Sequence, residues 1–142
     1  MKTKFSSIVS LRKKDMQACE RSILQNENKI ASKQTQIGAF QEEFLQLQMP
    51  QNGTFYAFRA YEESKNMLLS HIAFAKQELE GLLANKALLQ EQYKKCHIEY
   101  EKVKFLEKKA QDEMIKRLKR QEALEIDEVA LMLYNNAGGR II

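Results

Sequence analysis

The sequence contains few of the residues that break helices or build chemical sites. Among 142 residues there is a single proline, Pro50, and there are only five glycines. Tryptophan is absent, and the two cysteines, Cys19 and Cys96, lie far apart in the chain. Because proline and glycine most often interrupt helices, their scarcity predicts long helices. The cysteine spacing excludes a disulfide-rich secreted scaffold and predicts two small apolar residues within a helical seam.

Long apolar runs are also missing. No stretch approaches the roughly 20 apolar residues that a membrane-spanning helix needs. The first residues are basic, but the run that follows them is too short and too polar for a signal peptide. The sequence therefore predicts a soluble cytoplasmic protein.

No combination of residues predicts catalysis or cofactor binding. Gly138 and Gly139 follow no strand, which a phosphate-binding loop would require. His71 and His97 are far apart, and Cys96 with His97 alone makes a poor metal site. No nucleophile, base and orienting group can be assembled, and a two-helix rod has no cavity for a small molecule. We therefore expect no catalytic, cofactor-binding or metal-binding residues.

What the sequence does contain is charge and regularly spaced apolar residues. Charged residues make up 30% of the chain and apolar residues 44%. This composition is typical of long helices and coiled coils, and it is too apolar for a disordered chain. The net charge of +4 is mild and does not by itself require a nucleic-acid partner.

One short segment divides the chain into two arms. Residues 48–54 hold the only proline and an Asn-Gly pair, which favours a turn. We predict a helix over about residues 4–48, a turn at 48–54, a helix over about 55–134 and a loose tail over 135–142. The chain is then a single all-α domain. Its predicted fold is a long antiparallel two-helix coiled-coil hairpin whose second helix is much longer than the first.

Apolar residues recur at alternating spacings of four and three in both arms, which is the pattern of a coiled-coil seam. In the first arm ten of thirteen seam positions are apolar, and in the second arm twelve of fourteen. Asn26 and Lys33 are polar seam residues that either fix the register or extend to solvent. The seam comprises Phe5, Val9, Arg12, Met16, Cys19, Ile23, Asn26, Ile30, Lys33, Ile37, Phe40, Phe44, Leu47, Phe58, Tyr61, Lys65, Leu68, Ile72, Ala75, Leu79, Leu82, Lys86, Leu89, Tyr93, Cys96, Tyr100 and Val103.

Beyond Val103 the apolar spacing changes. The next apolar residues follow at intervals of three, four, four and four, and a run of fours unwinds a supercoil locally. We therefore expect the seam to loosen at Leu106, Ala110, Met114 and Leu118.

The second arm is longer than the first, so part of it lacks a partner. Folding about the turn places Phe44 opposite Phe58 and Phe5 opposite Cys96, and the chain beyond about residue 98 overhangs. Because a lone amphipathic helix is marginal in water, an apolar overhang predicts a further partner. Residues 94–120 carry ten basic and five acidic residues, a net +5. This end is then basic and the turn end acidic to neutral, unless the charges form an ordinary solvated face.

Three aromatic residues near the turn fall off the seam. Phe55, Tyr56 and Phe74 indicate an exposed recognition patch. For Phe55 and Tyr56 the alternative is that they cover the tip of the hairpin.

Residues 120–130 read Arg-Gln-Glu-Ala-Leu-Glu-Ile-Asp-Glu-Val-Ala near the end of a small basic protein with two long helices and a central turn. In these features nearly the whole chain resembles the family of the flagellar export protein FliJ, to which the stalk proteins of injectisomes are closely related. The Leu/Ile-Asp-Glu-x-Ala core is the most specific part. Ile126 stands where the family often has leucine.

The resemblance implies a non-enzymatic stalk and escort component of flagellar type III protein export. The family looks like the central stalk of rotary ATPases. The implied partners are the export ATPase hexamer, the cytoplasmic domain of the export gate and substrate-specific export chaperones. Contact with the membrane would be peripheral, at the inner membrane face and only through the export apparatus.

The resemblance also implies two sets of partner-binding residues. Contacts with the export gate would involve the gate set, which is Phe40, Phe44, Tyr61, Leu68 and Ile72. Contacts with the ATPase ring would involve the ring set, which is Lys108, Lys109, Lys116, Arg117, Lys119, Arg120, Leu124 and Val129.

Two other functions remain open from the residues alone. The chain could be a structural coiled-coil scaffold that pairs with itself and buries the overhang in a homodimer. A nucleic-acid-binding arm fits less well, because five acidic residues are mixed into residues 94–120 and only two of the basic ones are arginine. We therefore expect no nucleic-acid partner.

Overall fold

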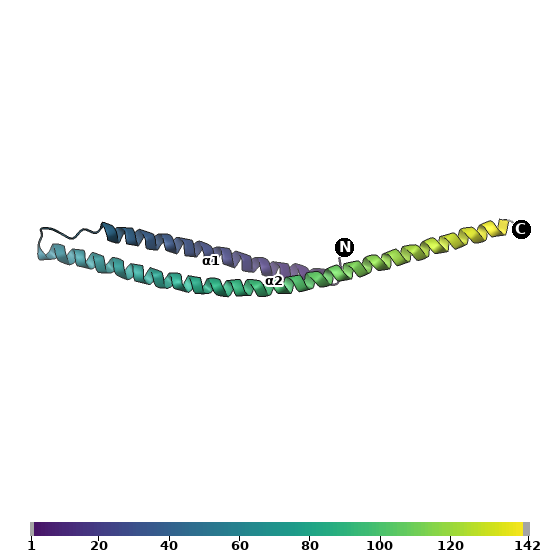
Figure 1. The fold of residues 1–142 in the computed structure, drawn as a ribbon, viewed down its shortest axis with the longest axis horizontal. Coiled ribbons are helices and arrows are strands. Elements are labelled where there is room, and N and C mark those ends of the chain that lie inside the picture. The colour runs from purple at the N-terminus through teal and green to yellow at the C-terminus, as the bar shows by residue number, and fades with distance from the viewer. Residues whose placement is uncertain (1, 141–142) are drawn as a thin grey trace. The chain divides into compact units, whose positions relative to one another are not determined.

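The computed structural model describes residues 2–140, and side chains over residues 2–137. Two α-helices, α1 (Ser6–Gln46) and α2 (Phe55–Arg140), account for nearly all of this part of the chain, which contains no strand. The helices run in opposite directions and lie side by side (Figure 1). The predicted all-α hairpin with a much longer second helix is confirmed.

The chain divides into two compact units to which both helices contribute. The central unit is Asp15–Cys96, and the terminal unit is Met1–Lys14 together with His97–Ile142. The central unit has nine lysines and arginines against ten acidic residues, a net −1. The terminal unit has fourteen against nine, a net +5. The positive charge of the chain therefore belongs to the terminal unit.

In the central unit the helices pair through the predicted seam, but Phe58, near the start of α2, is 36% exposed and lies outside it. Every seam position of α1 from Met16 to Phe44 is buried or half-buried, and so is every position of α2 from Tyr61 to Cys96. Ala75 is the most deeply buried, at 2% exposure. Burial of this apolar stripe is what holds the two helices together.

Asn26 and Lys33, two of the polar seam residues, behave differently. Asn26 is 4% exposed, and its Nδ2 donates to the Leu82 carbonyl at 3.1 Å while its Oδ1 accepts from Asn85 Nδ2 at 3.0 Å. Asn26 therefore takes the register-fixing role. Lys33 instead extends its Nζ to Glu78 Oε2 at 3.2 Å, at the edge of the seam.

The pairing of the two arms differs from the prediction. Cys96 faces Cys19, with 3.4 Å between their Sγ atoms, rather than Phe5, and the Phe40 ring lies 5.4 Å from the His71 ring. The predicted pairing is wrong because residues 47–54 do not reverse the chain tightly. They run on past the end of α1 before α2 begins (Figure 1), so α2 has several turns before it meets α1.

In the terminal unit, side chains cap the start of α1. The Phe5 N–H donates to Thr3 Oγ1 at 3.1 Å, and the Thr3 N–H donates to Ser6 Oγ at 2.8 Å. This reciprocal pattern follows the capping box, with serine in the place of glutamate. With Thr3 as the N-cap, residues 4 and 5 form a turn in which the Ser6 N–H donates to the Thr3 carbonyl at 3.1 Å, and this turn leads directly into α1. The Ser6 hydroxyl also donates to Glu107 Oε1 at 2.9 Å and so joins α1 to α2.

The seam continues through the terminal unit without the predicted change of spacing. Val103 is buried and Glu107, Ala110 and Met114 are half-buried, at spacings of four, three and four. Leu106, at 42% exposure, lies outside the seam. The predicted loosening after residue 103 is wrong. The prediction followed apolar residues only, whereas the seam position after Val103 is occupied by the polar Glu107, whose hydrogen bond with Ser6 satisfies it.

The C-terminal end of α2 also differs from the prediction. The helix runs through Asn135 to Arg140, so the predicted end at residue 134 and the loose tail over 135–140 are wrong. Residues 141 and 142 lie outside the described residues. Asparagine and glycine weaken a helix but, unlike proline, do not block it. A glycine cap would need a positive φ, which no described residue adopts.

Candidate partner-binding surfaces

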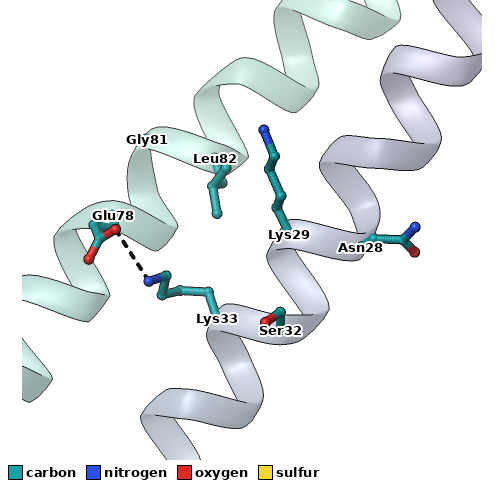
Figure 2. Close-up of a pocket in the computed structure, with 7 residues that line it drawn as sticks. All are labelled: Asn28, Lys29, Ser32, Lys33, Glu78, Gly81 and Leu82. Carbon is teal, nitrogen blue, oxygen red and sulfur yellow. Dashed lines mark hydrogen bonds and ion pairs between the residues drawn. The ribbon is translucent and has the colours of Figure 1, made fainter.

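The central unit has a shallow groove between its two helices, with a volume of about 630 Å³. Figure 2 shows Lys33 reaching across it to Glu78. Gly81 leaves one wall of the groove open, because a Cβ atom there would meet nothing within 4 Å. The groove is lined by Asn28, Lys29, Ser32, Lys33, Glu78, Gly81 and Leu82. Within the described part of the chain, no three histidine, cysteine or acidic side chains gather as metal ligands.

The gate set lies mainly inside the hairpin. Its five residues are all half-buried at seam positions, and the ring of Phe40 packs at a tilt against His71. The main contribution of these side chains is to the pairing of α1 with α2. Only their outer edges are available to a partner.

The aromatic residues off the seam are the more exposed ones. Phe55 is 74% exposed and Tyr56 76%, with their rings edge to face at 6.1 Å. The exposure of both side chains argues against the alternative that they cover the hairpin tip. Phe74 is also exposed, as the seam spacing predicts.

Beyond the last half-buried seam residue, Met114, lies a segment of α2 that we call the extension, residues 115–137. Every residue of the extension is exposed. The run from Val129 to Tyr134 consists of six apolar residues, which cover all sides of the helix. A helix that is apolar all round is normally buried against something.

The ring set lies on and next to the extension, and all eight of its side chains are exposed. The basic residues of the extension lie within 116–120, and an acidic segment follows at once. This segment is a feature that sequence reasoning, concerned with the net positive charge, missed. It consists of Glu122, Glu125, Asp127 and Glu128.

A hairpin with a buried seam, a surface groove and a bare helical extension defines a two-helix coiled-coil protein. Over residues 1–139 the chain matches the family described as Flagellar FliJ protein. The chain therefore belongs to the FliJ family and is a component of flagellar protein export. The resemblance noted in the sequence is thereby confirmed. No curated protein and no solved structure matches the chain.

Over the described residues, neither α1 nor α2 contains a stretch apolar enough to cross a membrane.

Proposed function

We propose that the chain is a non-enzymatic stalk and escort protein that links the flagellar export ATPase ring to the cytoplasmic domain of the export gate and to substrate-specific chaperones. It would act in the cytoplasm at the inner membrane face. Family membership supports the setting. The proposed contact with chaperones rests on the family alone.

The observation that carries the proposed ATPase contact is the bare extension. Its large apolar side chains are all exposed, so they are not buried by packing against α1. Burying one such leucine or valine in a partner is worth about 1.5–3 kcal/mol. The basic residues at 116–120 would add attraction to an acidic surface and speed association.

The proposed gate contact involves the loop end of the hairpin. The exposed Phe55, Tyr56 and Phe74 are available to a partner there, whereas the gate set stiffens the helices beneath them. Large aromatic side chains are frequent anchors of protein interfaces.

The test is ATP turnover by the cognate export ATPase with and without the protein. We expect the wild-type chain to raise turnover and to promote ring assembly. The double variant Leu124→Glu/Val129→Glu should bind at least about tenfold more weakly, because it loses two buried apolar contacts. Leu24→Glu, at an exposed position of α1, is the matched control and should behave as wild type. No effect of the wild-type chain on turnover or assembly would count against the proposal.

A second candidate, a self-associating scaffold, is favoured by the same exposed extension. Light scattering at micromolar concentration separates the two. A monomer supports the stalk and escort protein, whereas a stable dimer that the double variant abolishes supports the scaffold.

A further inference from the structure

The only two cysteines of the chain meet across the seam of the central unit. Cys19 of α1 and Cys96 of α2 are 77 residues apart in sequence, yet their Sγ atoms lie 3.4 Å apart. Both side chains are half-buried, so a small reagent can reach them. Cysteines that serve only as small apolar seam residues need not face each other. Here the register of the two helices places the two thiols in contact.

We propose that Cys19 and Cys96 form an intramolecular disulfide under oxidising conditions, so that the hairpin carries a redox-controlled covalent link between α1 and α2. The oxidant is a low-molecular-weight disulfide. In the reducing conditions of a cytosol the pair stays as two thiols.

The geometry requires little movement. A disulfide holds its sulfur atoms at about 2.05 Å, so the two Sγ atoms must approach by roughly 1.4 Å, which both side chains can share. Neither thiol is separated from the other by an intervening side chain, since the two sulfurs are in direct contact.

The reaction proceeds in two exchange steps. One cysteine thiolate attacks the small disulfide, forms a mixed disulfide with half of it and releases the other half as a thiolate. The second cysteine thiolate then attacks the protein sulfur of the mixed disulfide, forms the Cys19–Cys96 bond and releases the remaining half. Each cysteine gives its proton to solvent. Two electrons pass from the cysteines to the reagent, which leaves as two thiols.

The surroundings of Cys19 disfavour its thiolate form. Burial, then the Cys96 thiol and then the Asp15 carboxylate raise the pKa of Cys19. A thiol with a raised pKa is a poor first nucleophile at neutral pH.

The link would strengthen the hairpin. Closing a loop of 77 residues restricts the unfolded chain far more than the folded one. We expect the midpoint of thermal unfolding to rise by about 10 °C on oxidation.

The test is oxidation of the full chain with oxidised glutathione, followed by mass spectrometry without reductant. We expect a monomer that has lost two hydrogen atoms and carries no glutathione, in a yield that does not depend on protein concentration. Its unfolding midpoint should rise, and reductant should reverse both changes. In Cys19→Ser and Cys96→Ser the midpoint should not respond to the oxidant.

A matched control keeps both cysteines but moves one of them. The double variant Leu89→Cys/Cys96→Leu exchanges two seam residues, which shifts one thiol by seven residues, or roughly 10 Å along the helix. It should form the intramolecular bond at least about a hundredfold less readily, and should collect glutathione instead. If the wild-type chain also yields only glutathione adducts or cross-linked dimers, the proposal is wrong. The same conclusion follows if the exchanged variant closes as readily as the wild type.

Discussion

At the scale of single residues, Asn26 determines how the two helices align. It is the one buried polar side chain among the described residues, and both its nitrogen and its oxygen have partners on α2. Sliding the helices by one heptad would bring Glu78 or Gln92 to the place of Asn85, and Asn26 would lose the amide partner that it has in this register. An unsatisfied buried polar group costs about 1–3 kcal/mol, so the amide disfavours shifted registers.

Replacing Asn26 by alanine tests this role. Asn26→Ala should lower the free energy of unfolding by about 1–3 kcal/mol, because it leaves a small cavity and deprives the Leu82 carbonyl and Asn85 of a partner. The measurement is urea unfolding followed by circular dichroism. Asn28→Ala, two residues away and exposed, should change the value by less than about 0.5 kcal/mol. Equal losses in the two variants would show that the amide does not set the register.

The sequence predicts some of these residues and not others. The spacing alone identifies Asn26 and Lys33 as polar seam positions. It misses Glu107, because a glutamate belongs in a seam only when a partner such as Ser6 is present, and that partner is 101 residues away. The contact between Cys19 and Cys96 was missed for the same reason, since it depends on the register of the two arms.

At the scale of the helices, the seam spacing and the register have different origins. Heptad spacing is a local property, and it predicts nearly every inward-facing residue of both arms. The register depends on the path of the connecting segment, and composition indicates only that this segment is not helical. Because residues 47–54 run on past α1, the seam reaches Met114 and the overhang is shorter than predicted.

Gly38 of α1 and Gly81 of α2 lie in the interior of their helices. A Cβ atom at Gly38 or Gly81 would meet nothing within 4 Å. Gly38→Ala and Gly81→Ala should therefore each raise the free energy of unfolding by about 0.5–1 kcal/mol through better helix propensity. Chemical denaturation of the single variants measures this gain.

The connecting segment supplies the control. At Gly53 a Cβ atom would lie 3.1 Å from the Cβ of Ala57, so Gly53→Ala should give no gain in stability. A loss of stability in both helical variants would mean that these glycines are needed for close packing, contrary to the structure.

At the scale of the whole molecule, the chain combines a hairpin that buries its own apolar seam with an extension whose apolar residues are exposed. The sequence predicted that the end of the second helix would lack a partner, but it placed the start of this overhang at about residue 98 rather than 115. The ring set is exposed on or beside it, whereas the gate set is half-buried in the seam. Exposed apolar residues show where a partner can bind, but they do not identify that partner. The export apparatus enters through membership of the FliJ family.

We propose that the extension links the hairpin to the rest of the export apparatus. This proposal is tested most directly by measuring secretion of flagellar subunits in a strain that lacks the gene and is supplied with either the full chain or a chain ending at Met114. Because every residue of 115–137 is exposed, the shortened chain should keep its hairpin and the unfolding midpoint of the full chain. We predict that the full chain restores secretion and that the shortened, folded chain restores less than about a tenth of it, as expected when an anchoring apolar contact is lost. Full secretion with the shortened chain would contradict the account.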